Sequence, residues 1–318
     1  MIDFVKIRIE NPDWVAFLNN PLLDFKQSVS VGTGELSGNM IAEFQGLKFT
    51  KYVSNVMTIE GSLHKYKNLG KHNHDDFNRL QIKDVIDEIK EKFNLHTCNC
   101  TLVNLEVGAN VIPVIPSKEL IRYLYMHHRT EFRYEDIKNG YLKRASYEDY
   151  QLKAYDKAKQ YGLGTELFRF EVRLLRNRKI RRYGLHTLED LHDPDHLLVL
   201  CRYIQKSWME ILYWDRKLEP WLSTNRFIND KLMSWSNANY WSSLAQDKNI
   251  HRNRYSKEYR SVQKLQDLIS DRTQVLMEGL LVRKLITLLN HPKVQLPPII
   301  EGGERTIQNE TYDDDDDW

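Results

Sequence analysis

Cysteine is scarce in this chain, with three residues at positions 98, 100 and 201 among 318. An odd and sparse set of thiols cannot build a disulfide framework. Cys98 and Cys100 lie close together, but no second cysteine pair completes the four ligands of a structural zinc site. We therefore interpret all three cysteines as ordinary reduced thiols.

Long apolar runs are missing as well. No window approaches the roughly 20 consecutive apolar residues that a membrane helix needs, and the start MIDFVKIRIE lacks the apolar run of a secretory signal. Hydrophobic residues make up 41% and charged residues 28% of the chain, which excludes the disordered and fibrous classes. We expect a cytoplasmic globular protein that contacts no membrane.

The net charge of +2 is small, but the charges are unevenly placed. Five aspartates occupy positions 313–317, so the rest of the chain is distinctly basic. Clustered basic residues suit contact with phosphates, although a charged face that stays in water has the same composition. The clusters comprise Arg173, Arg176, Arg178, Lys179, Arg181 and Arg182 in one segment and His251, Arg252 and Arg254 in another.

The N-terminal half mixes strand and helix patterns. Strands are predicted where β-branched and aromatic residues recur or alternate, at 4–9, 47–53, 56–66 and 101–111. Helical spacing of apolar residues predicts a helix at 84–93. Ser117 is expected to cap a second helix that includes Leu124 and Tyr125.

Beyond Gly184 the pattern becomes mainly helical. Long periodic segments predict helices within 188–214 and 257–289. The segment 218–254 predicts no clear element, and we favour a core position for its tryptophans. The predicted fold class is α+β, with mixed strands and helices followed by a mainly helical region. The chain divides into a mixed region at 1–185, a helical region at 186–295, and an irregular exit with an acidic tail at 296–318.

Reactive residues gather between positions 150 and 175. Strand alternation places Lys153, Tyr155 and Lys157 on one face of a first segment. In a second segment, alternation turns the row Arg169, Glu171 and Arg173 away from the apolar face. Gly162 and Gly164 lie between the two segments and favour a hairpin, which would set the tyrosine across from the Arg-Glu-Arg row on the solvent side.

This constellation suits phosphate chemistry. A phenol with a pKa near ~10 is a poor nucleophile at neutral pH, so it needs nearby cations or a metal to favour the phenolate. Lys153, Lys157 and Arg169 would serve this purpose and would neutralise charge on a phosphate in the transition state. A partly exposed structural strand explains the same pattern without any chemistry.

Candidate metal ligands lie on other polar strand faces. Glu106 shares a face with Asn104 and Asn110, where a carboxylate is not needed for packing. His64 is predicted on a strand, and His72 and His74 follow in a polar loop. Carboxylates with a histidine can hold Mg²⁺ or Mn²⁺, whereas surface histidines in a loop are the commoner explanation of the His72 and His74 pair.

Taken in order, these motifs resemble a known family. The start Met1-Ile2-Asp3, the loop Lys71-His72-Asn73, the strand around Glu106, the Tyr155-Asp156-Lys157 run and the Arg169-x-Glu171 strand are similar to the replication initiators of filamentous phages. They also resemble rolling-circle plasmid Rep proteins, which are HUH-like endonucleases. The resemblance covers roughly residues 1–190. It implies that residues 1–185 form an HUH-like nicking and joining domain with a central antiparallel sheet flanked by helices, and that 186–295 form a helical DNA-binding or accessory domain.

The resemblance implies a site-specific DNA endonuclease and strand transferase. Tyr155 would cut one strand at an origin, become joined to the 5′ phosphate and later reseal the ends, with Lys157 as its cationic neighbour. Glu106, Glu171 and His72 would hold Mg²⁺ or Mn²⁺. Asn73 between the two histidines departs from the family's His-hydrophobe-His pattern, so His64 and His74 stay open as the histidine ligand.

The implied partner is DNA, both as origin duplex and as single strand. A host helicase and polymerase are further implied partners, and a homodimer stays open. The residues expected to contact DNA are Lys153, Arg169, Arg173, Arg176, Arg178, Arg181 and Arg182.

Three alternatives remain. A mobilisation relaxase or a single-strand transposase would use the same phosphotyrosine chemistry. A non-catalytic DNA-binding protein would keep the basic surface without cutting DNA. A structural or regulatory protein would keep its basic runs in water. If Tyr155 is not the nucleophile, Tyr147, Tyr150 and Tyr161 are the next candidates.

Overall fold

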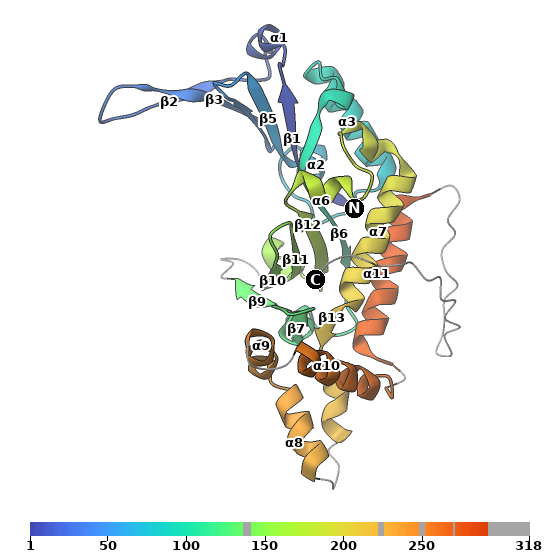
Figure 1. Ribbon diagram of the computed structural model, residues 1–318. Coiled ribbons are helices and arrows are strands. Elements are labelled where there is room, and N and C mark those ends of the chain that lie inside the picture. The colour runs from blue at the N-terminus through green and yellow to red at the C-terminus, as the bar shows by residue number, and fades with distance from the viewer. Residues whose placement is uncertain (136–140, 222–225, 248–251, 270, 292–318) are drawn as a thin grey trace.

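The computed structural model describes residues 1–135, 141–221, 226–247, 252–269 and 271–291 (Figure 1). The predicted exit and acidic tail at 296–318 lie outside these residues. In the described ranges, no helix combines the length and apolarity needed to cross a membrane. All three cysteines are free thiols, as expected.

A ten-stranded antiparallel sheet forms the body of the described chain, in the order β2-β3-β4-β5-β1-β6-β12-β11-β10-β9. Its strands are β1 (Ile2–Glu10), β2 (Lys26–Val29), β3 (Leu36–Phe44), β4 (Leu47–Lys51), β5 (Val56–Ser62), β6 (Thr101–Val111), β9 (Arg133–Glu135), β10 (Leu142–Ser146), β11 (Tyr150–Asp156) and β12 (Phe168–Leu174). A second, three-stranded sheet contains β13 (Ile211–Tyr213), β7 (Leu124–His127) and β8 (Thr130–Glu131), in that order. The predicted α+β class with an antiparallel sheet is confirmed.

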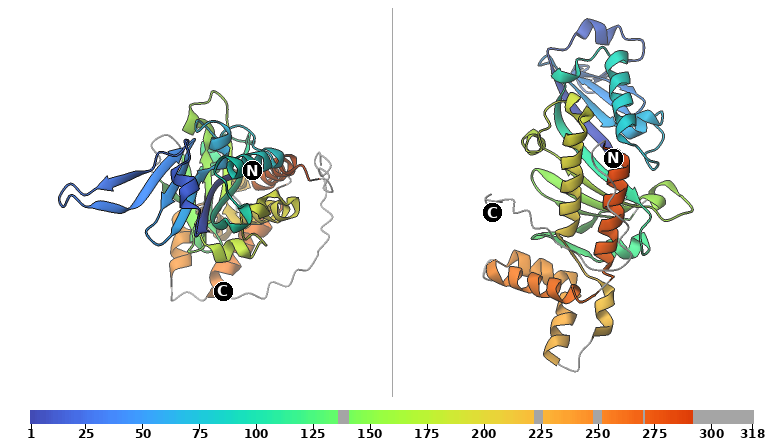
Figure 2. Two further views of the ribbon diagram at one scale, coloured as in Figure 1. Left: turned by 90° about the horizontal axis from the view of Figure 1, so that it is seen from above. Right: turned by 90° about the vertical axis from the view of Figure 1, so that its right-hand side faces the viewer.

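Helices cover the sheet and extend the molecule at one end. They are α1 (Trp14–Leu18), α2 (Leu63–Lys67), α3 (Arg79–Lys92), α4 (Ser117–Arg122), α5 (Lys157–Tyr161), α6 (Asn177–Arg181), α7 (Pro194–Met209), α8 (Arg226–Trp235), α9 (Ala238–Gln246), α10 (Arg252–Gln266) and α11 (Thr273–Leu289). Figure 2 shows α7 and α11 side by side along one face of the sheet, with α8 to α10 at the far end from α1.

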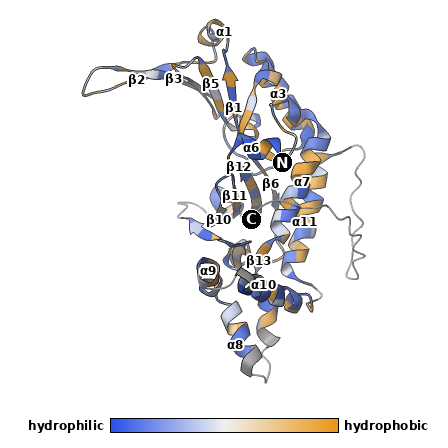
Figure 3. Cartoon of the chain, in the orientation of Figure 1, coloured by the Kyte–Doolittle hydropathy of each residue, from blue (hydrophilic) through white to orange (hydrophobic). Residues whose placement is uncertain are grey.

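The central strands send their apolar residues toward α7 and α11. Phe168 and Phe170 of β12 pack edge-on against Trp208 of α7, with ring centroids 6.0 and 5.1 Å away. Hydrophobic residues recur along both helices, drawn orange in Figure 3. Because alternate residues of a strand point to opposite faces, the polar residues of β12 must lie on the other side of the sheet.

A second hydrophobic cluster accounts for the segment at 218–254. Trp235 and Trp241 are buried with Trp214, Leu218 and residues of β7 and α10. The expected core position is confirmed for Trp235 and Trp241, and the side chain of Trp221 lies outside the described set. Side chains at 219–228 and 248–253 are outside the described set, and Arg254 of the second basic cluster is exposed on α10.

Several predicted elements begin or end at other residues, and two of these differences move candidate residues. The strand at 56–66 stops at Ser62, whose hydroxyl accepts from Lys65 N and starts α2, so His64 is on a helix. The expected cap Ser117 instead donates from its Oγ to Glu166, and α4 ends at Arg122. Leu124 and Tyr125 are therefore in β7 rather than in a helix.

Both of the long helices predicted in the C-terminal region are interrupted. The first is interrupted because the residues after α7 pair with another strand. After α7 the chain forms β13, whose residues Ile211, Leu212 and Tyr213 are all buried and pair with β7. A short apolar run fits a buried strand or a helix equally well, and pairing with β7 decides the outcome. The predicted helix at 257–289 is divided into α10 and α11.

Replacing Trp208 with alanine should lower the free energy of unfolding by about 3–5 kcal/mol, because the indole is fully buried between α7 and β12. Urea denaturation followed by circular dichroism measures this change. Leu276→Ala on α11, whose side chain is 42% exposed, is the matched control and should change it by less than about 1 kcal/mol. Equal losses in both variants would contradict the assigned packing.

Candidate active site

The predicted hairpin of β11 and β12 is confirmed. The two strands pair antiparallel, with Tyr155 opposite Arg169, Lys153 opposite Glu171 and Gln151 opposite Arg173. The tyrosine therefore lies across from the Arg-Glu-Arg row. The connection is not a simple turn, because it contains α5, which ends at Tyr161 and is capped by Gly162 with a left-handed φ of 64°.

Three carboxylates meet on the face opposite α7 and α11. Asp3 of β1, Glu106 of β6 and Glu171 of β12 come from adjacent strands, and their oxygen atoms all lie within 4.8 Å of one another. All three residues are buried. Asp3 is not among the expected ligands, and strict alternation along β1 would put it on the apolar face with Val5. The register of β1 against β6 shifts between Ile2 and Val5, and such an irregularity re-aims a side chain.

Cations hold the carboxylates in place. Lys153 Nζ donates to Glu106 Oε2 at 2.6 Å and to Glu171 Oε1 at 2.8 Å. Arg169 donates from Nε to Glu171 and lies 3.4 Å from Asp3 Oδ2. Lys153 and Arg169 are 8% and 3% exposed. The prediction that Lys153 and Arg169 face solvent is therefore wrong. Both side chains are buried because they pair with buried carboxylates.

Tyr155 lies inside this network, on the same face as Glu106 and Glu171. Its hydroxyl donates to Glu171 Oε2 at 3.2 Å and accepts from Lys157 Nζ at 3.3 Å. Burial, reinforced by the Glu171 charge, raises the pKa of Tyr155 well above its usual value. The expectation that neighbouring cations would favour the phenolate is wrong for the protein without its substrate, because burial and the carboxylates outweigh the cations.

The other charged groups are shifted as well. Burial and the neighbouring Glu171 raise the pKa of Glu106 to about 7, despite Lys153. Burial, aided by Arg169, lowers the pKa of Lys157 to about 8. Burial also acts to raise the pKa of Glu171, but Lys153 and Arg169 outweigh it and hold that pKa well below its usual range.

The candidate histidines lie beside this network rather than in it. His64 is buried, stacks on Phe77 and has Nε2 2.6 Å from Asp75 Oδ1, and burial lowers the pKa of His64 to about 4. His72 has Nδ1 3.6 Å from Asp75, and its ring centroid is 4.2 Å from that of His74. None of the three belongs to the carboxylate group at Asp3.

Asn73, between the two loop histidines, reaches into the site instead. Its Nδ2 donates to Asp3 Oδ2 at 2.5 Å, and its Oδ1 accepts from Lys157 Nζ at 2.7 Å and from Tyr161 at 2.5 Å. In the sequence, Asn73 belongs to a loop that carries the resemblance and departs from the His-hydrophobe-His pattern, and neither feature predicts a role in the site. The one available signal was its place in a loop of polar residues, which does not show that the side chain is buried.

Apart from the buried Arg169, the expected DNA-binding arginines fall into two groups. Arg173 donates to Asn104 at 3.1 Å, packs over Phe4 and lines the hollow above the site. Beyond the end of β12, the chain exposes Arg176, Arg178, Arg181 and Arg182. Of these, Arg178 pairs with Asp149 at 2.7 Å. The four exposed side chains lie on the surface, where a phosphate can reach them.

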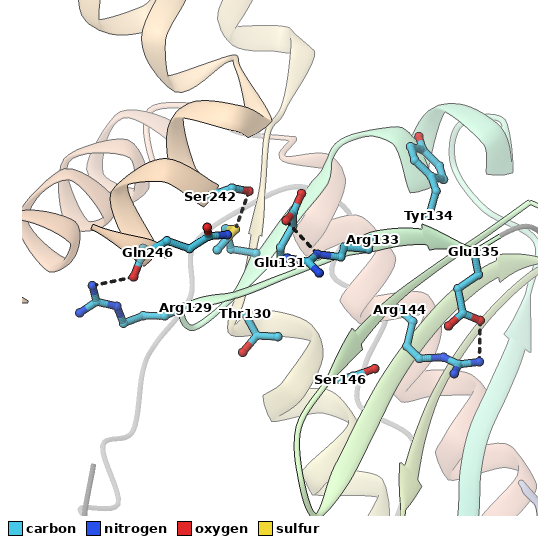
Figure 4. Close-up of a pocket in the computed structure, with 12 residues that line it drawn as sticks. Arg129, Thr130, Glu131, Arg133, Tyr134, Glu135, Arg144, Ser146, Ser242 and Gln246 are labelled. Carbon is cyan, nitrogen blue, oxygen red and sulfur yellow. Dashed lines mark hydrogen bonds and ion pairs between the residues drawn. The ribbon is translucent and has the colours of Figure 1, made fainter. Parts of the chain in front are cut away.

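Two hollows adjoin the site. One, of about 450 Å³, is lined by the carboxylate group together with Tyr155, Lys157 and Arg173. The other, of about 700 Å³, runs between β8, β9 and α9 and is lined by Arg129, Arg133 and polar residues (Figure 4). Arg144 lines both hollows, and it pairs with Glu135 at 2.6 Å.

The donor chemistry fits a divalent cation at the carboxylates. Asp3, Glu106 and Glu171 offer oxygen atoms only, which Mg²⁺ and Mn²⁺ prefer. A second group in the described chain, His127, His128 and Glu210, can also hold a metal ion and offers imidazole nitrogens.

Comparisons with known proteins found similarity to solved structures only. No protein-family model matches the chain, and no curated protein matches it. A solved structure described as a rolling circle replication initiator protein from Geobacillus stearothermophilus matches 82% of this chain and 96% of its own, with 12% identity and a TM-score of 0.43. The chain thus has a structural match to a rolling-circle initiator.

Proposed function

We propose that this chain initiates rolling-circle replication by nicking one DNA strand at an origin and later rejoining the ends through Tyr155. The observation that carries the proposal is the position of the Tyr155 hydroxyl, hydrogen-bonded to Glu171 and Lys157 beside the Asp3, Glu106 and Glu171 carboxylates. A phenol, a basic nitrogen and a carboxylate group for a divalent cation in one hollow are the parts that phosphoryl transfer to tyrosine requires.

The reaction exchanges one phosphodiester for another. The Tyr155 oxygen attacks the scissile phosphorus, a bond forms between the tyrosine and the 5′ phosphate, and the bond to the 3′ oxygen breaks. The phenol proton leaves the tyrosine, and the 3′ oxygen takes up a proton to become a free hydroxyl, from which a polymerase can extend. Attack by a 3′ hydroxyl on the phosphotyrosine reverses the exchange and rejoins the strand.

Lys157 is the best placed acceptor of the phenol proton. Its Nζ lies 3.3 Å from the Tyr155 oxygen, and its pKa of about 8 gives it a substantial neutral fraction in mildly alkaline solution. Glu171 also contacts the hydroxyl, but a carboxylate with a depressed pKa is a weak base. After accepting the proton, the lysine carries a positive charge beside the reacting phosphate.

Asp3, Glu106 and Glu171 would hold Mg²⁺ or Mn²⁺, which polarises the scissile phosphate when bound. Lys153 and Arg169 position these carboxylates rather than the DNA, since both are buried against them. Asn73 orients Asp3 and Lys157 together. His72 and His64 are not needed for this assignment.

The target strand is best accommodated along the two hollows that share Arg144. From the reacting phosphate it would pass Arg144 toward Arg129 and Arg133 (Figure 4). The exposed arginines at 176, 178, 181 and 182 would contact phosphates of the duplex. We assign residues 1–185 to the HUH-like nicking domain, whose core α7 and α11 complete, and the rest of 186–295 to an accessory role.

A non-catalytic DNA-binding protein is the second candidate. The burial of Tyr155 and its raised pKa favour this reading, because a phenol closed into a salt-bridge network can be structural. A relaxase or a transposase would use the same site chemistry, and the replicon that carries the gene distinguishes these from an initiator.

Wild-type protein, incubated with Mn²⁺ and labelled single strands tiled across its replicon, should form a covalent adduct on the peptide containing Tyr155. Tyr155→Phe should form none, because its ring lacks the attacking oxygen. Denaturing electrophoresis and mass spectrometry of the peptide measure this. Tyr147→Phe is the matched control and should keep the adduct. DNA binding without any wild-type adduct would support the non-catalytic candidate, and an adduct that persists in Tyr155→Phe would move the nucleophile elsewhere.

Glu106→Gln should slow adduct formation by about 100-fold or more while most DNA binding remains, since it removes one charge from the carboxylate group but keeps its shape. Single-turnover cleavage and fluorescence anisotropy measure the two quantities separately. If binding and cleavage fall together, Glu106 has a structural role.

The rate of adduct formation should rise as pH passes about 8, because Lys157 accepts a proton only after losing its own. Lys157→Arg keeps its proton throughout the accessible range, so this rise should vanish and the rate above pH 8 should fall by about 100-fold or more. A pH profile of single-turnover rates tests this. An unchanged rise in the arginine variant would assign the proton transfer to another group.

A further inference from the structure

A second set of metal-ligating side chains lies in the three-stranded sheet. His127 ends β7, His128 follows it, and Glu210 caps the C-terminus of α7 just before β13. Because Ile211 of β13 pairs with His127, the sheet brings Glu210 alongside both histidines. None of these three residues contributes to the carboxylate group at Tyr155.

The backbone turns both imidazoles to one side. Neighbouring residues of a strand normally point to opposite faces, but His128 has a left-handed φ of 48°, which is uncommon for a residue with a side chain. The two rings are consequently 4.2 Å apart between centroids. Both Nε2 atoms lie 3.4 Å from the same oxygen, Glu210 Oε2.

The hydrogen bonds around His127 leave one nitrogen lone pair unused. The Tyr147 hydroxyl donates its single proton to the His127 carbonyl at 2.6 Å, so at its 2.7 Å contact with His127 Nδ1 the ring nitrogen is the donor. In a neutral imidazole, Nε2 then carries a lone pair. His127 is 1% exposed, and Nε2 has no hydrogen-bond partner although it faces a carboxylate oxygen. A lone pair facing a carboxylate is repulsive unless a cation lies between them.

The distances from the two histidine nitrogens to the Glu210 oxygen suit a small metal ion. Two ligand atoms that each lie 2.0–2.1 Å from a tetrahedral zinc are about 3.3 Å apart, close to the 3.4 Å found here for both histidine nitrogens. We propose that His127 Nε2, His128 Nε2 and Glu210 bind one Zn²⁺-class ion. Imidazole ligands favour such an ion over Mg²⁺, and the contact from Tyr147 to Nδ1 is the outer support that metal-bound histidines commonly have.

The site joins three elements and leaves a way in for the ion. It ties the end of α7 to the turn between β7 and β8, and the next residues, Arg129 and Thr130, line the hollow of Figure 4. The side chains of His128 and Glu210 are 31% and 29% exposed, so a fourth ligand can come from solvent. The site does not depend on the nicking function proposed for Tyr155.

The test is zinc binding by the full chain after removal of metal with a chelator. Competition with a chromogenic zinc indicator gives the affinity, and visible absorption after adding Co²⁺ reports ligand geometry. Wild type should bind Zn²⁺ far more tightly than Mg²⁺, and Zn²⁺ should raise its melting temperature. His128→Gln and Glu210→Gln, both half-exposed positions that tolerate substitution better than buried His127, should each weaken binding by about 100-fold or more.

Two controls separate this site from other histidines. His186→Gln, at an exposed position, should bind Zn²⁺ as wild type does. The double variant His72→Gln with His74→Gln should also keep the high-affinity site, and it removes any zinc held by that loop. Tyr147→Phe should weaken binding by about 10-fold, since it removes only the outer support.

Loss of zinc affinity confined to His128→Gln, Glu210→Gln and, more weakly, Tyr147→Phe would support the site. Zinc affinity that is absent from wild type, or that is unchanged in His128→Gln and Glu210→Gln, would overturn it. In that case a proton shared between the histidines and Glu210 would account for the geometry. Neither outcome bears on cleavage by Tyr155, because no step of the test uses DNA.

Discussion

The burial of the Glu171 carboxylate is the constraint that organises this protein. Glu171 is 1% exposed in the middle of the large sheet, and it accepts from Lys153, Arg169 and Tyr155. A buried charge is tolerated only when it is paired and hydrogen-bonded, and removing one partner of such a pair costs about 3–5 kcal/mol. The backbone makes room for it at Gly108, where an added Cβ would lie 2.6 Å from the Glu171 Cβ. Strand register and site chemistry are thus set together.

The same network opposes ionisation of the Tyr155 hydroxyl. The Tyr155 phenol stays protonated because burial and Glu171 oppose its ionisation, while Lys157, made less basic by burial and Arg169, lies against it. Under the proposed function, the Tyr155 hydroxyl is activated only when a cation binds the carboxylates and a phosphate lies beside Lys157. Both bring charge into the hollow. Such coupling would protect DNA from cutting at sites that do not fill the hollow.

The two groups that could hold a metal ion differ in their chemistry. Asp3, Glu106 and Glu171 present oxygen atoms on three strands of the large sheet, which suits hard cations that exchange readily. His127, His128 and Glu210 present imidazoles from the small sheet, next to the turn that shapes one end of the second hollow. On the two proposals, the first group would serve the reaction and the second would hold the small sheet against α7.

The sequence by itself determined those features of the site that depend on residues close together in the chain. Alternation along β11 and β12 predicted which residues share a face with Tyr155, and two glycines indicated that the segments pair, because both are short-range properties of a strand. Only the tertiary structure decided burial, partners and irregular backbone. Asp3 enters the site through a register shift in β1, Asn73 through its loop, and Glu210 through the pairing of β13 with β7. Each of these contacts joins residues far apart in the chain, so they cannot be predicted from local periodicity.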